Sequence, residues 1–262
     1  MSQIKQPAFF ISHGSPMMAV EKSKTVTFLQ QLGLSFAKPK AIIVFSAHFD
    51  LARDIVITRG SAPKTIHDFY GFPQPLYDIQ YNAPGSPELA DKIADLFTQH
   101  GFSPVLDSQQ GWDHGVWIPL RLIYPEADIP VIEVSINSRL GAAINYQYGQ
   151  ILAPLRNEGV MIIGSGSITH NLKEVFNPSL EVNKKERVKN FTAWVNAKLS
   201  IGDLNALLNY QNEAPDLLFN HPTAEHFLPL LAALGSSDLR SAKRIHEDIE
   251  YDVLAMDAYQ FS

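Results

Sequence analysis

The chain has 262 residues, of which 45% are hydrophobic and 18% are charged, and its formal net charge is −6. This composition allows a large hydrophobic core and excludes a disordered chain, while the acidic balance argues against nucleic-acid binding. Cysteine is absent. Disulfides and thiolate ligands are therefore excluded, and any metal must be bound by His, Asp, Glu or backbone oxygen.

The first residues are polar, and no segment approaches the roughly 20 consecutive apolar residues that a membrane span needs. We therefore expect a soluble, cytoplasmic protein without a membrane or nucleic-acid partner. The length fits a single domain over residues 1–262. The sequence leaves the oligomeric state open.

Short apolar runs alternate with helical patterns along the chain, which is typical of an α/β domain. Strands are predicted at 7–11, 41–45, 54–58, 129–136 and 160–163, with one or two edge strands within 251–261. Helices are predicted at 87–100, 144–157, 184–199, 203–210 and 223–234. The segment 61–85 shows neither period and is rich in Pro, Gly and aromatic residues, as functional loops often are.

The histidines are the informative residues. Of the nine present, His13 and His48 come directly after the first two predicted strands, and His170 lies shortly after the strand at 160–163. Ligands of open α/β sheets bind beyond the carboxyl ends of the strands, so these three side chains can converge. Imidazole is the commonest metal ligand, and we predict a mononuclear metal site there. A structural, hydrogen-bonded role is the alternative for each residue.

A fourth histidine, His226, lies near the start of the predicted helix 223–234, with Thr223 as its expected N-cap. This position can face a site at the strand ends. The neighbouring Glu225 would point about 100° away around a helix, and we do not expect it to be a ligand.

Two further histidines lie in polar or irregular segments. His114 is in a short turn that leads into a helix, and His67 belongs to the irregular segment 61–85. For these two, the residues alone favour a structural role. The run Gly164-Ser165-Gly166-Ser167 is predicted to be a tight loop, because it lacks the glycine spacing of a nucleophile elbow.

Several motifs occur in one order along the chain: Ser12-His13-Gly14-Ser15-Pro16, Ser46-Ala47-His48, Thr65-Ile66-His67-Asp68-Phe69, Asp113-His114-Gly115 and Thr223-Ala224-Glu225-His226-Phe227-Leu228-Pro229-Leu230. Together they resemble the class III extradiol ring-cleavage dioxygenases, specifically the DOPA 4,5-dioxygenase-like branch. The resemblance covers nearly the whole chain. It implies a three-layer αβα sandwich around a mixed, mostly parallel sheet.

The resemblance also implies roles for individual residues. It gives His13, His48 and His226 as metal ligands. His170 corresponds to a residue that is a fourth ligand in some members and the catalytic acid/base in others. His114 is implied to be catalytic and to bind substrate, and His67 is implied to bind substrate from a loop over the pocket.

The reaction implied by the resemblance opens the ring of a small aromatic diol with O₂. That chemistry calls for Fe²⁺, usually held by two histidines and one carboxylate, whereas an all-histidine set suits zinc. We therefore expect Zn²⁺ in the isolated protein and Fe²⁺ for ring cleavage. The alternatives are a zinc-dependent hydrolase on the same scaffold and a non-enzymatic metal- or ligand-binding protein.

Overall fold

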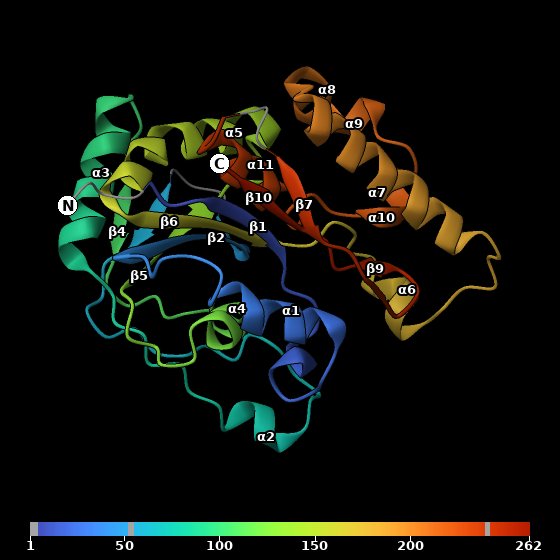
Figure 1. Ribbon diagram of the computed structural model, residues 1–262, viewed down its shortest axis with the longest axis horizontal. Coiled ribbons are helices and arrows are strands. Elements are labelled where there is room, and N and C mark those ends of the chain that lie inside the picture. The colour runs from blue at the N-terminus through green and yellow to red at the C-terminus, as the bar shows by residue number, and fades with distance from the viewer. Residues whose placement is uncertain (1–4, 52–54, 239–241) are drawn as a thin grey trace.

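The computed structural model describes residues 5–51, 55–238 and 242–262. An eight-stranded sheet runs through the middle of the molecule (Figure 1) in the order β4-β3-β5-β2-β6-β1-β10-β7. Its strands are β1 (Ala8–Ser12), β2 (Ala41–Asp50), β3 (Val56–Thr58), β4 (Val105–Asp107), β5 (Val131–Ile136), β6 (Val160–Gly166), β7 (Lys243–His246) and β10 (Ala258–Phe261). The short strands β8 (Ile249–Glu250) and β9 (Leu254–Ala255) pair separately.

The central strands β5, β2, β6 and β1 are parallel to their neighbours within this group. Strands β1, β5 and β6 are buried along their whole length. Burial on both faces explains why they read as continuous apolar runs in the sequence. Strand β10 is antiparallel to both β1 and β7, and β3 is antiparallel to β5. Because β7 lies outside it, β10 is an internal strand and not the edge strand predicted within 251–261. The predicted mixed, mostly parallel sheet is confirmed.

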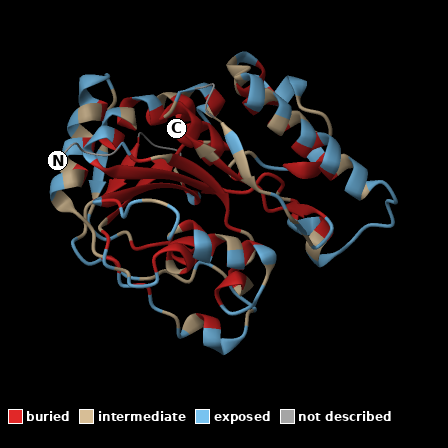
Figure 2. Cartoon of the chain, viewed as in Figure 1, coloured by how far each residue is buried: buried red, intermediate tan, exposed pale blue. Residues whose placement is uncertain are grey.

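Helices cover both faces of the sheet. The helices of the described residues are α1 (Lys24–Leu32), α2 (Gln74–Tyr77), α3 (Pro87–Gln99), α4 (His114–Ile123), α5 (Gly141–Leu152), α6 (Leu172–Phe176), α7 (Lys184–Ile201), α8 (Leu204–Leu208), α9 (Tyr210–Glu213), α10 (Leu217–Asn220) and α11 (Leu228–Gly235), with 3₁₀ turns η1 (Pro16–Ala19) and η2 (Ala153–Glu158). Helices α3, α5 and α11 lie on one face, and α1 and α4 lie on the other (Figure 1). Figure 2 shows that the buried residues concentrate in the sheet between these layers.

Helix α11 lies directly against β6 because the strand carries glycine at the contact. A Cβ atom on Gly164 would be 2.0 Å from the carbonyl oxygen of Pro229, and one on Gly166 would be 2.2 Å from that of His226. The predicted loop at 164–167 is therefore wrong: strand β6 continues through Gly166, and the glycines serve close backbone packing.

The helix predicted at 223–234 begins later, at Leu228, and a bend followed by a turn occupies 223–227. Pro229 lies in the first turn, where its missing N–H costs no hydrogen bond and its fixed φ favours a helix start. Thr223 is not the N-cap. The predicted helix 203–210 is split into α8 and α9, and part of the strand predicted at 54–58 lies outside the described residues.

Candidate metal centre

Five histidines from different elements meet beyond the carboxyl ends of the central strands. His13 directly follows β1, and His170 comes four residues after the end of β6. His48 lies within β2, where the pairing with β5 shifts register, and such irregularities re-aim side chains. His114 opens α4, and His226 lies in the turn before α11.

The first part of the cluster is formed by His13, His48 and His114. The Nε2 atoms of His13 and His48 are 3.1 Å apart. Ring centroids of His48 and His114 are 3.8 Å apart, and those of His13 and His114 are 5.4 Å apart. Among the described residues, the ligand atoms of these three lie within 4.8 Å of one another and could hold a metal ion.

The second part is formed by His170, Glu225 and His226, whose ligand atoms also lie within 4.8 Å of one another. The rings of His170 and His226 are stacked, with centroids 3.3 Å apart. The His226 ring also lies 5.3 Å from that of His13 and 5.0 Å from that of His48, so the two parts adjoin. The four histidines predicted as ligands therefore lie in one region, divided between these two adjoining groups, and His114 belongs to the first.

A serine hydroxyl fixes the tautomer of His13. Ser165 Oγ donates its hydrogen to the carbonyl oxygen of Gly115 and lies 3.0 Å from His13 Nδ1. Because that hydrogen is already committed, His13 Nδ1 must donate to Ser165. The lone pair of His13 is then on Nε2, the atom that faces His48.

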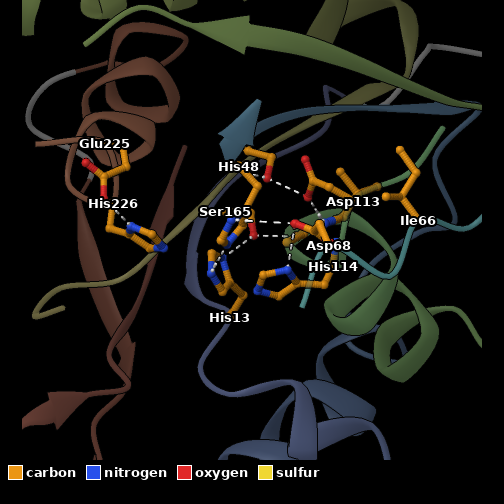
Figure 3. A network of polar contacts seen from close by, with 12 residues as sticks. His13, His48, Ile66, Asp68, Asp113, His114, Ser165, Glu225 and His226 are labelled. Atoms are coloured by element: carbon orange, nitrogen blue, oxygen red, sulfur yellow. Dashed lines mark hydrogen bonds and ion pairs between the residues drawn. The ribbon is translucent and has the colours of Figure 1, made fainter. Parts of the chain in front are cut away.

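The carboxylate of Glu225 fixes the tautomer of His226. Nδ1 of His226 lies 3.1 Å from Glu225 Oε1, and a carboxylate can only accept. His226 Nε2 is left with the lone pair; it is buried and has no hydrogen-bond partner. The expectation that Glu225 points away is wrong, because residues 223–227 form a bend and a turn instead of a helix. Figure 3 shows Glu225 next to the His226 ring, on the opposite side of the cluster from Asp68.

Burial keeps these imidazoles neutral. Desolvation, followed by the neighbouring imidazoles, lowers the pKa of His13 and of His226 well below the usual value. Burial lowers the pKa of His48 to about 4 and that of His170 to about 3. At neutral pH, these four side chains are therefore neutral and need lose no proton to bind a cation.

These features fit a resident metal. The Nε2 of His226 is buried without a hydrogen-bond partner, and the Nε2 of His13 carries a lone pair 3.1 Å from the Nε2 of His48. A buried acceptor without a partner is unfavourable, and a cation would satisfy it. The anchoring of Nδ1 by oxygen in His13 and His226 is the outer-shell pattern that metal-binding histidines usually show.

His67 is not part of the cluster. Its Nε2 is 3.0 Å from the carbonyl oxygen of Ile79, and its ring packs against Phe69, Tyr77 and Trp117. Phe69 in turn packs edge-on against His114. The irregular segment 61–85 thus contacts the cluster through Phe69 and Asp68, which both lie against His114. His67 instead contacts another residue of the same segment, Ile79.

Sequence reasoning missed Ser165, Asp68 and Glu225 as partners of the histidines. Ser165 contacts His13 across 152 positions of the chain. Its only sequence signal was its place between two glycines after a strand. Asp68 and Glu225 each lie next to a histidine in the sequence, His67 and His226, and a carboxylate beside a histidine is the signal that indicates them.

Comparisons with known proteins agree with this geometry. Residues 7–262 match the family described as the catalytic LigB subunit of aromatic ring-opening dioxygenase. The chain belongs to the LigB family. It is therefore an extradiol aromatic ring-opening dioxygenase, an oxidoreductase of a metal-dependent family.

Several LigB-related proteins match over nearly their whole length. The "4,5-DOPA dioxygenase extradiol" of Beta vulgaris is 42% identical over 259 residues, covering 97% of this chain and 96% of that protein. The Escherichia coli (strain K12) protein of the same name is 40% identical, covering 98% and 94%. A crystal structure of an uncharacterized protein from Escherichia coli K12 superimposes with a TM-score of 0.81 at 34% identity, covering 98% of this chain and 100% of that one.

In the described part of the chain, no helix combines the length and the apolar character needed to cross a membrane.

Proposed function

We propose that this LigB-family protein opens the ring of a catechol such as DOPA with O₂, using a metal bound by His13, His48 and His226, with His170 as fourth ligand or acid/base. The observation that carries this proposal is the convergence of anchored, neutral imidazoles around the buried, unpartnered Nε2 of His226. The relatives from Beta vulgaris and Escherichia coli, both named for DOPA, support the substrate class.

We propose Fe²⁺ as the working metal and expect Zn²⁺ in protein isolated without added iron. When bound, iron supplies Lewis acidity toward the diol and electron transfer with O₂. Proton transfer and substrate binding are carried out by side chains. Neutral His170 lies against His226 and can accept a hydroxyl proton from the diol and return it later, and His114 can hydrogen-bond a second hydroxyl.

The irregular segment 61–85 contributes the wall next to His114. Phe69 packs on the His114 ring and on Trp117. An aromatic wall of this kind suits a flat ring. We propose that His67 contributes to substrate binding indirectly, because its Nε2 holds this segment through the carbonyl oxygen of Ile79.

Elemental analysis followed by iron reconstitution tests the proposed activity. The iron-loaded protein should consume oxygen and form a yellow ring-opened semialdehyde from DOPA or another catechol. Absence of turnover of any catechol at verified full iron occupancy would refute it. Hydrolase activity of the zinc form that persists without oxygen would support the zinc hydrolase instead.

Single alanine substitutions test the ligand set. H13A, H48A and H226A should each lose stoichiometric metal, whereas H67A should retain it. H170A separates the two roles of His170: metal loss indicates a ligand, and full metal content with lost turnover indicates an acid/base. If H13A, H48A and H226A all keep full metal content, the proposed ligand set is wrong.

A further inference from the structure

Asp68, in the irregular segment 61–85, uses both carboxylate oxygens on a single histidine. Its Oδ1 accepts the backbone N–H of His114 at 2.9 Å, and its Oδ2 lies 2.9 Å from Nδ1 of the His114 ring. The same Oδ2 lies 3.7 Å from Nδ1 of His48. Figure 3 shows the carboxylate among these side chains.

The backbone around this contact is fixed from two directions. The N–H of Ile66 donates to the carbonyl of Trp112, and the indole N–H of Trp117 donates to the carbonyl of Ile66. At the start of α4, Asp113 is the N-cap and accepts from Val116. The N–H of His114, which has no partner within the helix, is satisfied by Asp68. Asp68 and the His114 ring are therefore held in one relative position.

The contact fixes the tautomer of His114. A carboxylate accepts hydrogen bonds and cannot donate, so the ring hydrogen is on Nδ1 and the lone pair is on Nε2. Both oxygens of Asp68 face N–H groups of His114, Oδ1 the backbone N–H and Oδ2 the ring Nδ1, so the carboxylate acts as an acceptor at both positions. The ring is near the proposed ligands, 3.8 Å from His48 between centroids.

We propose that Asp68 is a positioning residue that holds His114 in its Nδ1–H tautomer, so that His114 Nε2 acts as a hydrogen-bond acceptor for a hydroxyl of the bound diol. This role of Asp68 in substrate binding rests on the proposed function, whereas the tautomer does not. This determines specificity, because the substrate group that faces His114 Nε2 must be a hydrogen-bond donor. A diol with a free hydroxyl satisfies the site, and the corresponding methyl ether leaves His114 Nε2 unpaired.

The test is ¹⁵N NMR of the histidine rings in the zinc-loaded protein, with His114 assigned by its substitution. In the unaltered chain, the His114 shifts should show a protonated Nδ1 and an unprotonated Nε2. In D68N, the new amide group faces Nδ1 as a donor, and the pattern should invert. In D68E, which keeps two acceptor oxygens, the original pattern should persist. D78N is the matched control: Asp78 lies in the same segment, but its carboxylate accepts from Gln74.

Activity provides the second readout. Iron-loaded D68N should lose roughly 10- to 100-fold in kcat/KM for a catechol, at unchanged metal content, while D78N keeps normal turnover. A protonated Nε2 on His114 in the unaltered protein overturns the proposal, even if no variant folds. So does an unchanged tautomer in D68N, or an equal activity loss in D78N. If the tautomers behave as expected but no catechol is turned over, the activity assigned to the protein fails and the tautomer control by Asp68 stands.

Discussion

Replacing Ser165 by alanine removes one hydroxyl that serves two buried groups. Ser165 Oγ donates to the carbonyl of Gly115 and accepts from Nδ1 of His13. Both Ser165 and His13 are buried, with exposed fractions of 0% and 2%. In S165A, the Gly115 carbonyl and the His13 N–H are therefore left without a partner, and the His13 ring loses the contact that sets its orientation.

The size of the effect follows from these two groups. An unsatisfied buried donor or acceptor costs about 1–3 kcal/mol, so the two together lower the free energy of unfolding of metal-free S165A by roughly 2–6 kcal/mol. Removal of an outer-shell partner of a metal-binding histidine weakens metal affinity about 10- to 100-fold. We expect both effects in S165A.

Two measurements check this prediction: denaturant unfolding of the metal-free protein, and a zinc titration against a competing chelator. S167A is the matched control. Ser167 is also buried on the same stretch of chain, but its hydroxyl donates only to the carbonyl of Thr169. S167A should lose stability without a change in zinc affinity. Unaltered zinc affinity in S165A, or an equal loss of affinity in S167A, would refute the role given to the Ser165 hydroxyl.

Three further predictions concern the other supports of the site. In G166A, the added Cβ would lie 2.2 Å from the carbonyl oxygen of His226, so we expect a lower Tm and less than stoichiometric zinc; normal values for both would contradict it. E225Q keeps an oxygen next to His226 but removes its charge, and zinc affinity should fall about tenfold; the chelator titration measures this, and unchanged affinity argues against the contact. The metal-free protein should lose stability on acidification, because the pKa of His48 falls from 6.5 unfolded to about 4 folded, mainly through burial. This contribution is fully present above pH 6.5 and lost as pH falls toward 4; denaturant unfolding at pH 7 and 4.5 measures it, and a smaller loss is expected in H48A.

The residues that the sequence placed correctly are those whose positions follow from strand direction. His13 and His48 were located by the apolar runs before them, because parallel strands deliver their carboxyl ends to one edge of the sheet. The buried central strands were recognisable for the same reason. The short edge strand β4, with Val105 and Leu106 partly exposed, has too few residues to show a pattern.

The errors came from local geometry and from contacts distant in sequence. The helix predicted at 223–234 starts too early, and in that helix Glu225 would point away from His226. Pro229 indicates the later start, because proline favours the first turn of a helix. Sequence periodicity cannot predict the contact between Ser165 and His13, because that contact depends on how β6 pairs with β1. The pairing of Asp68 with His114 likewise depends on the path of an irregular segment, for which sequence patterns give no coordinates.

The proposed ligands are spread from His13 near the beginning of the chain to His226 near its end, and each belongs to a different part of the fold. A chain emerging from the ribosome therefore cannot assemble the trio until the segment just before α11 has been synthesised and α11 has docked on β6. Metal loading then follows the last long-range docking step, and a fragment that ends before residue 226 lacks one ligand whatever metal is present. Bound metal in turn stabilises the finished fold as a whole, because it ties the first strand to the last helix of the sandwich.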